Sequence, residues 1–164
     1  MTKGGAGNGT APLRLRSALD QPAIFTIGYE GLVQEQLIDL LLATGVRTVL
    51  DVRAVPQSRK AGFSKTVLAA SLLSSGLGYV HERRLGTPKP GRDAARRGRS
   101  SEMAAIFGEH MQSASAQDAL AVAADLTAGQ ATCLLCFERA PHDCHRSIVA
   151  AMIQARTGQI IRHL

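Results

Sequence analysis

Short apolar runs alternate with segments of helical period along most of this chain, and this alternation restricts the fold more than any other feature. The apolar runs, several of them rich in β-branched residues, lie at residues 23–28, 46–52, 77–81, 131–136 and 159–163. The segments with apolar residues three and four apart lie at residues 32–44, 64–75, 101–112, 115–128 and 143–156. Strands that alternate with helices are typical of α/β proteins, so we predict an α/β three-layer sandwich. Helices would cover both faces of a mostly parallel sheet of about five strands.

Residues that start or stop helices support these boundaries. Gly45 and Gly76 each follow a helical segment, where glycine is a usual terminating residue. Ser64 is the predicted N-cap of the second helical segment, and Ser115 with Asp118 forms a variant of the capping box. The element boundaries therefore follow from local residue types.

The chain divides into a tail and one domain. Residues 1–20 are rich in Gly, Ala and Thr and show no hydrophobic period, so we predict a disordered tail. Residues 21–164 have the length of a single domain, and an apolar content of 45% is enough to bury a core. We therefore predict a single α/β domain at residues 21–164.

Cysteine content and the absence of long apolar runs indicate the cellular compartment in which the protein works. Three cysteines in no disulfide-like spacing predict free thiols in a reducing cytoplasm. No apolar run approaches the roughly 20 residues that cross a bilayer, so we expect no membrane association. Cys133 and Cys136 have the spacing of a CxxC redox motif, but residues three apart on a strand point to opposite faces. We therefore do not interpret that pair as a redox site.

Positive charge is concentrated in one segment. The chain has 19 basic and 13 acidic residues, a net charge of +6. The segment from Arg83 to Arg99 contains seven basic residues and only Asp93 as an acid, which leaves 12 residues of each sign elsewhere. Because the segment shows no hydrophobic period, we predict a basic loop at residues 83–99. Connections this long are usually functional or disordered.

Polar and reactive side chains follow each of the first four predicted strands. In a parallel sheet these positions meet at the carboxyl edge, where α/β proteins bind ligands. We predict catalytic roles there for Glu30, Asp51, Glu138 and Cys144. We predict ligand-binding roles for Tyr29, Arg53, Ser58, His81, Arg83, His145 and Arg146.

The segment from Leu134 to Arg146 places a thiol, an imidazole and a guanidinium at the predicted start of the last helix. The free N–H groups and the positive dipole of a helix N-terminus attract anions, and Arg146 would reinforce that attraction. The same field would lower the pKa of Cys144 and make its thiolate available. We therefore predict that the ligand carries a phosphate or carboxylate group.

Each of these predictions has a structural alternative. The thiol of Cys144 is equally well interpreted as a core group, and His145 as a hydrogen-bonded packing residue. Cys136 ends an apolar strand and is interpreted as a buried structural thiol. Asp51 and Arg53 form, in the alternative interpretation, an internal ion pair that organises loops. In the alternative interpretation of the basic segment, it is only a solvated loop.

Four potential soft-metal ligands lie close together in the sequence. Cys136, His142, Cys144 and His145 fall within ten residues, and zinc accepts such a set. Their spacing matches no standard zinc pattern, so we predict no metal site, and the cofactor stays open.

Several short motifs together resemble the family known as domain of unknown function 488. The matching pieces are Thr26-Ile27-Gly28-Tyr29-Glu30, Asp51-Val52-Arg53 with Pro56 and Ser58, Phe63, Leu85-Gly86, Leu135-Cys136-x-Glu138-x-x-Pro141-x-x-Cys144-His145-Arg146, and His163. The resemblance covers residues 25–164. It implies a small cytosolic α/β protein, and some members have been loosely associated with DNA repair. It transfers no residue with an assigned role.

Two functional hypotheses follow from these patterns. In the first, the chain is an enzyme or ligand-binding domain for a phosphorylated small molecule or nucleotide, with Arg53, Arg146 and the helix N-terminus holding the anion. In the second, it is a nucleic-acid-binding module in which the segment from Arg83 to Arg99 contacts phosphates. A third hypothesis joins them, because the basic segment would also close the site over an acidic ligand. The sequence predicts no oligomeric state.

Overall fold

The computed structural model describes residues 22–164, so the tail predicted at residues 1–20 lies outside the described part of the chain. These residues form one sheet in which all neighbouring strands are parallel. The strands are β1 (Ile24–Gly28), β2 (Thr48–Asp51), β3 (Gly78–His81), β4 (Thr132–Cys136) and β5 (Ile161–His163), in the order β3-β2-β4-β1-β5. The predicted parallel sheet is therefore confirmed, with 5 strands.

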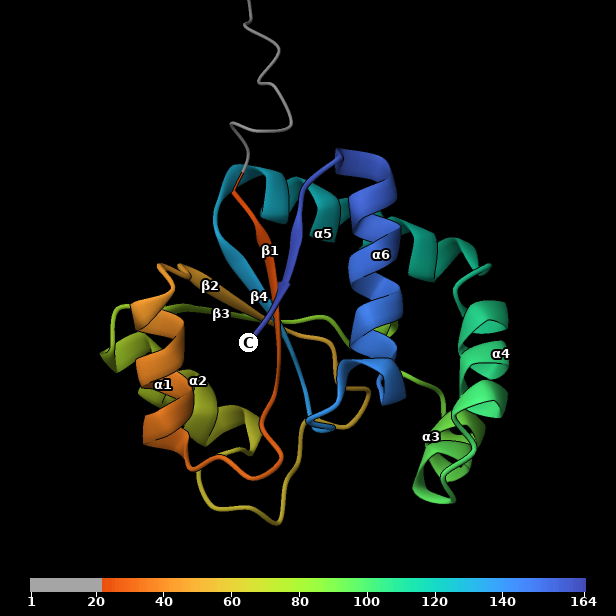
Figure 1. Cartoon of the computed structure of the whole chain (residues 1–164), viewed down its shortest axis with the longest axis horizontal. Helices are drawn as coiled ribbons and strands as arrows, with labels where there is room; N and C mark the ends of the chain where they lie inside the picture. Colours follow the sequence, from red (N-terminus) through yellow and green to blue (C-terminus); the bar gives the residue numbers. More distant parts are fainter. Residues whose placement is uncertain (1–21) are drawn as a thin grey trace, which may run out of the picture.

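Helices cover both faces of the sheet (Figure 1). One layer contains α1 (Gln34–Ala43) and α2 (Lys65–Ser74). The opposite layer contains α3 (Lys89–Arg96), α4 (Ser100–His110), α5 (Ala114–Gly129) and α6 (His145–Thr157), and single 3-10 turns form η2 (Arg83–Leu85) and η3 (Pro141–Asp143). The predicted three-layer sandwich is confirmed. Within residues 22–164, every helix is too short or too polar to span a bilayer.

Side-chain alternation in the central strand β4 explains why the sheet has two cores. Cys133 and Leu135 pack with the buried leucines of α1 and α2. Leu134 and Cys136 face the other way and pack with α5 and α6. Because successive side chains point to opposite faces, an entirely apolar strand needs a covering layer on each side. Cys133 and Cys136 therefore point to opposite faces, as predicted.

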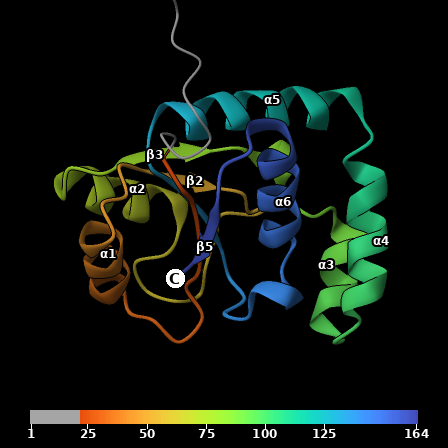
Figure 2. The same cartoon turned by 45° about the horizontal axis from the view of Figure 1, so that its top comes forward.

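The order of the strands determines where a ligand can bind. The chain runs from β1 to β2 and β3 through α1 and α2, and then returns to β4 and β5 through helices of the other layer. β4 lies between β1 and β2, yet the helix that follows it, α6, lies on the opposite side of the sheet from α1 and α2 (Figure 2). Such a reversal opens a crevice at the carboxyl ends of the strands, the usual binding position in α/β sheets.

The basic segment at residues 83–99 is largely helical, so the prediction of a loop there is wrong. It contains η2 and α3, and α3 packs against α4. Gly91 and Ala94 are the buried residues of α3, and such small side chains create no apolar period that a sequence pattern would show. Asp93 pairs with Lys89 and Arg96 at helical spacing, which offsets repulsion among the cations.

Two glycines allow loops to lie directly against the carboxyl ends of the strands. A Cβ atom at Gly28, the last residue of β1, would overlap the carbonyl oxygen of Glu138 in the loop after β4. A Cβ atom at Gly86 would overlap the backbone of Ala54 in the loop after β2. The glycines in two motifs of the sequence therefore serve close backbone approach.

Two helix starts differ in detail from the prediction. Ser113, and not Ser115, caps α5, and its side chain accepts a hydrogen bond from the N–H of Ala116 at 3.2 Å. Ser64 is the N-cap of α2 as predicted, but its hydroxyl bonds the backbone of Ser58 instead of the first helical turn. This contact ties the loop after β2 to α2.

Candidate functional site

A cleft of about 620 Å³ opens at the carboxyl ends of β1, β2 and β4. The loop after β2 lines one side of it, and α3 with Met103 of α4 lines another. Tyr29 after β1, residues 136–138 at the end of β4 and His145 at the start of α6 complete the lining. Segments far apart in the sequence therefore converge at the edge of the sheet where the sequence predicts a site.

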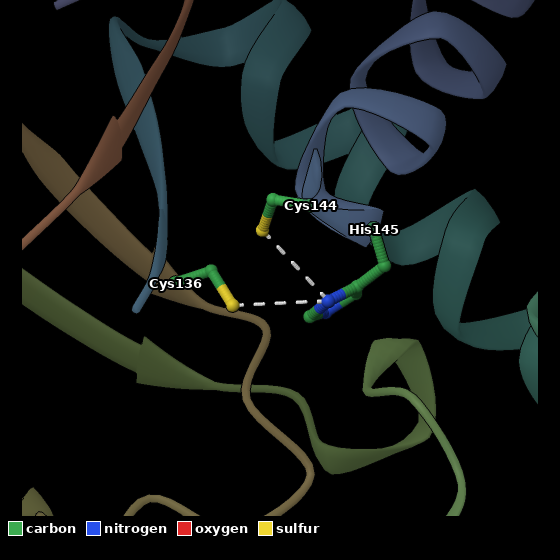
Figure 3. Close-up of side chains that lie close together, drawn as sticks. All are labelled: Cys136, Cys144 and His145. Atoms are coloured by element: carbon green, nitrogen blue, oxygen red, sulfur yellow. Dashed lines mark hydrogen bonds between the residues drawn. The ribbon is translucent and has the colours of Figure 1, made fainter. Parts of the chain in front are cut away.

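Two thiols and an imidazole meet beside this cleft (Figure 3). Nδ1 of His145 lies 3.7 Å from Sγ of Cys136 and 4.0 Å from Sγ of Cys144. Nε2 of His145 lies 2.9 Å from the carbonyl oxygen of Val52, which only accepts, so Nε2 carries a proton. The ring also packs edge-on against Phe107, with 5.2 Å between centroids. His145 is therefore held in one orientation, with Nδ1 directed at the sulfurs.

A carboxylate lies on the open side of this cluster. Sγ of Cys136 donates to Oε2 of Glu138 at 3.4 Å, and both residues line the cleft. Cys144 is 2% exposed and does not line the cleft. Burial raises the pKa of the Cys144 thiol, and the neighbouring thiol of Cys136 raises it further. The prediction that the helix field lowers this pKa is therefore wrong.

Positively charged side chains reach the cleft from two separate segments. Arg59 and Lys60 come from the loop after β2, and Arg92 and Arg96 come from α3. Arg96 is paired with Asp93 at 2.9 Å, but within residues 22–164 no carboxylate forms an ion pair with the other three. The cleft therefore has a surplus of positive charge.

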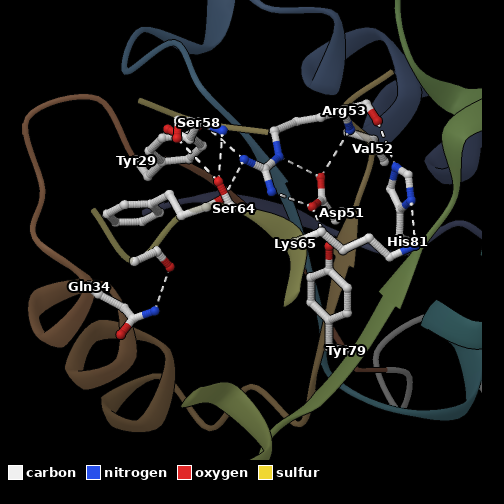
Figure 4. A network of polar contacts seen from close by, with 12 residues as sticks. Tyr29, Gln34, Asp51, Val52, Arg53, Ser58, Ser64, Lys65, Tyr79 and His81 are labelled. Carbon is white, nitrogen blue, oxygen red and sulfur yellow. Dashed lines mark hydrogen bonds and ion pairs between the residues drawn. The ribbon is translucent and has the colours of Figure 1, made fainter. Parts of the chain in front are cut away.

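A buried polar network supports the loop after β2 (Figure 4). The guanidinium of Arg53 donates to both carboxylate oxygens of Asp51, from Nε at 2.9 Å and from Nη2 at 2.6 Å. Its Nη1 donates to the hydroxyl of Tyr29 at 3.0 Å and to the carbonyl of Phe63 at 2.8 Å. Tyr79 donates to Asp51 at 2.6 Å. The alternative interpretation of Asp51 and Arg53, an internal ion pair that organises loops, is thus confirmed.

The electrostatics of the network agree with its geometry. Although burial by itself lowers the pKa of Arg53, the bonds and charge of Asp51 outweigh it and raise that pKa. Burial, followed by the hydrogen bond to Asp51, raises the pKa of Tyr79. Asp51 is fully buried and makes no part of the cleft lining. Its carboxylate therefore stabilises the fold and does not face the cleft.

Arg146 lies beneath the loop after β4 and away from the cleft. It is fully buried, and its guanidinium donates to the carbonyl oxygens of Glu138 and Arg139 and to the hydroxyl of Thr26. The carboxylate of Glu30 accepts from the N–H of Arg139 at 3.0 Å. Both predicted site residues therefore hold the loop that carries Glu138, and the predicted anion contact of Arg146 has no support from its position.

His81 and Arg83 border a second, more open hollow of about 720 Å³. Nε2 of His81 lies 2.8 Å from the carbonyl oxygen of Arg53, and Nδ1 lies 3.2 Å from Nζ of Lys65. Both hollows share Ala54 and Val55 in their lining. His81 therefore supports the loop after β2 and does not line the cleft.

The cleft brings together part of the predicted set. The predicted residues that line it are Tyr29, Arg53, Ser58, Glu138 and His145. Those that do not are Glu30, Asp51, His81, Arg83, Cys144 and Arg146. The catalytic and ligand-binding roles of both groups stay predictions.

Several residues of the cleft lie outside the predicted set, and the chemically most important of them are Cys136, Arg59, Lys60 and Arg92. The first was interpreted as a structural thiol because it ends an apolar strand. A signal for the second and third was present, since Arg59-Lys60 is a basic pair in the loop directly after a predicted strand. Arg92 belongs to the basic segment, and only the packing of α3 directs it to the cleft.

A comparison with protein families supports the resemblance seen in the motifs. The model described as "Domain of unknown function DUF488" matches residues 34–153, from the start of α1 into α6. Among the motif residues, Thr26-Ile27-Gly28-Tyr29-Glu30 and His163 fall outside this range. No curated protein and no solved structure matched the chain.

Proposed function

Because this chain belongs to the DUF488 family, whose description states no activity, we propose from the residues that line its cleft that it is an enzyme acting on a phosphorylated small molecule or nucleotide. The observation that supports this most is charge. Arg59, Lys60 and Arg92 line one cleft, and within residues 22–164 none of them has a carboxylate partner. Phosphate oxygens are the natural partners of such cations, and arginine binds them through two parallel hydrogen bonds.

The remainder of the lining suits an organic group attached to the phosphate. Phe137 is 43% exposed at the mouth of the cleft, and its ring meets Tyr29 edge-on at 5.3 Å. Val55 and Met103 add apolar surface. Ligand sites typically combine a mainly apolar lining with a few polar groups that fix orientation. A nucleoside phosphate or a comparable molecule matches both properties.

Glu138 is our candidate for the general acid or base. Of the three predicted catalytic carboxylates, Asp51 is bonded to Arg53 and Glu30 to the backbone of Arg139, while Glu138 alone lines the cleft. Proton transfer requires a group within hydrogen-bonding reach of the ligand, so a catalytic acid or base must line the cleft, as Glu138 does. The thiol of Cys136 lies beside it at 3.4 Å.

Ligand-dependent thermal stability tests this proposal. The wild-type melting temperature should rise with at least one member of a panel of nucleotides, sugar phosphates and inorganic phosphate. Lys60→Ala and Arg92→Gln should each weaken the fitted affinity about tenfold or more, because each removes a charged hydrogen bond. Arg97→Ala is the matched control, since Arg97 ends the same helix but does not line the cleft. No shift with any ligand, or an equal loss in Arg97→Ala, would contradict the proposal.

The nucleic-acid hypothesis has less support from the structure. Ion pairs with Glu82, Asp93 and Glu102 engage Arg84, Lys89, Arg96 and Arg99, more than half of the basic segment's cations. The segment is also packed on α4 and lacks the freedom of a flexible basic arm. DNA and RNA binding by fluorescence anisotropy at two salt concentrations decides between the hypotheses. Tight binding that falls steeply with salt and weakens equally in Arg92→Gln and Arg97→Ala would favour nucleic acid.

A further inference from the structure

The cluster of Cys136, Cys144 and His145 has the composition and geometry of a metal-binding site. The three residues come from the end of β4, the residue before α6 and the first residue of α6. One ligand atom of each lies within 4.8 Å of the other two. The proposed phosphate-binding function does not use this cluster, and the two inferences are independent.

The two distances between nitrogen and sulfur agree with tetrahedral zinc. With zinc–sulfur bonds of about 2.3 Å and zinc–nitrogen bonds of about 2.0 Å, two neighbouring sulfur and nitrogen ligands lie about 3.5 Å apart. Nδ1 of His145 lies 3.7 Å from Sγ of Cys136 and 4.0 Å from Sγ of Cys144. Shifts of about half an ångström or less would bring both pairs to the coordinated distance.

The tautomer of His145 is already the one a metal requires. Because Nε2–H donates to the carbonyl oxygen of Val52, at 2.9 Å, Nδ1 has a free lone pair. Figure 3 shows Nδ1 directed at both sulfurs. A histidine ligand typically donates its other ring N–H to a carbonyl or carboxylate in this way, which fixes the ring and strengthens the ligand. The cluster therefore possesses the outer partner of a metal site as well as the ligands.

A fourth position is available on the side of the cleft. Cys136 and His145 line the cleft, and Oε2 of Glu138 lies 3.4 Å from Sγ of Cys136. Three protein ligands with one position facing a cleft are characteristic of catalytic zinc sites, whereas structural sites are closed by four. Two thiolates with one imidazole favour zinc and chemically similar ions over magnesium or calcium.

We propose that Cys136, Cys144 and His145 bind one zinc-like divalent metal ion whose fourth coordination position faces the cleft. In the sequence these residues, with His142, are possible zinc ligands, but their spacing predicts no metal site, because two of them are neighbours at a helix start and the third ends a strand. Only the packing of β4 against α6 brings the three together.

Cobalt titration tests the proposal. Metal-free wild-type protein, kept reduced, should bind one Co²⁺ with thiolate-to-cobalt charge-transfer absorption and the intense visible bands of tetrahedral cobalt, and Zn²⁺ should abolish both. Cys136→Ser, Cys144→Ser and His145→Gln should weaken binding beyond the roughly 10–100-fold loss expected for an outer-shell partner. Cys133→Ser is the matched control, because Cys133 is equally buried on the same strand but faces the other layer.

A second measurement uses only wild-type protein, so it tests the proposal even when the variants fail to fold. Zn²⁺ should protect Cys136 and Cys144 from alkylation, read by mass spectrometry, and leave the modification of Cys133 unchanged. Absence of stoichiometric cobalt absorption, a loss in Cys133→Ser equal to that in Cys136→Ser, or a Cys136–Cys144 disulfide that forms in place of metal uptake would overturn the proposal. Loss of phosphate binding alone would not overturn the proposal, because phosphate binding depends on different residues.

Discussion

Arg53 and Asp51 form a buried ion pair in which both oxygens of the carboxylate accept hydrogen bonds from one guanidinium, with the shorter contact at 2.6 Å. Asp51 ends β2, and Arg53 is the second residue of the loop that lines the cleft. The pair therefore joins the sheet to the wall of the candidate site.

Asp51→Asn should destabilise the protein strongly, because it leaves the guanidinium of Arg53 buried beside a neutral amide. Removing one partner of a buried ion pair costs about 3–5 kcal/mol in the free energy of unfolding. Urea denaturation of wild type and variant measures the difference. Asp93→Asn is the matched control, since both oxygens of that carboxylate are likewise paired with cations, Lys89 and Arg96, but at the surface of α3. Similar losses in both variants would show that the buried pair is no more important than an exposed one.

Gly28→Ala should displace the loop after β4, because the added Cβ would overlap the carbonyl oxygen of Glu138. Overpacking of this kind typically costs about 1–3 kcal/mol. Gly108→Ala provides the control, since a Cβ at that position of α4 meets nothing within 4 Å. In a helix interior, alanine is favoured over glycine by about 1 kcal/mol, so this control should be neutral or stabilising. Thermal or urea denaturation of the two variants gives the comparison, and a tolerated Gly28→Ala would contradict the close approach.

His163 should make stability depend on pH. Burial, followed by the positive charge of Arg146, lowers the pKa of His163 below its ordinary value of 6.5, and Nδ1 lies 2.7 Å from the hydroxyl of Thr26. A histidine with a lowered pKa binds its proton more weakly in the folded state than in the unfolded state. Its contribution to stability is therefore complete above pH 6.5 and decreases as the pH falls toward the folded-state pKa.

Two measurements check this dependence. The imidazole of His163 should titrate below pH 6.5 in NMR spectra of the folded protein. Urea denaturation above and below that pH should show a smaller loss of stability in His163→Gln than in wild type. Equal losses in the two proteins, or a titration midpoint at or above the ordinary value, would refute the prediction.

Local patterns of the sequence were sufficient to predict the layered fold. The spacing of apolar residues distinguishes strands from helices, and entirely apolar strands such as β4 require cover on both faces. Parallel strands also bring their carboxyl ends to one edge, so Tyr29, Arg53 and Glu138 were expected at a shared site without coordinates. The pattern failed at α3, where the buried residues Gly91 and Ala94 are too small to produce a hydrophobic period.

Which polar groups face a ligand, by contrast, depended on contacts between residues distant in the sequence. Arg146 donates to Thr26, which is 120 positions away, and His145 donates to the carbonyl of Val52, which is 93 positions away. A guanidinium or an imidazole is chemically the same whether it binds a backbone carbonyl or a ligand, so residue type leaves its partner open. A buried polar group must form hydrogen bonds with the groups around it. Packing of α6 and the loop after β4 against the sheet therefore bonds Arg146 to the backbone of that loop and directs His145 toward two thiols.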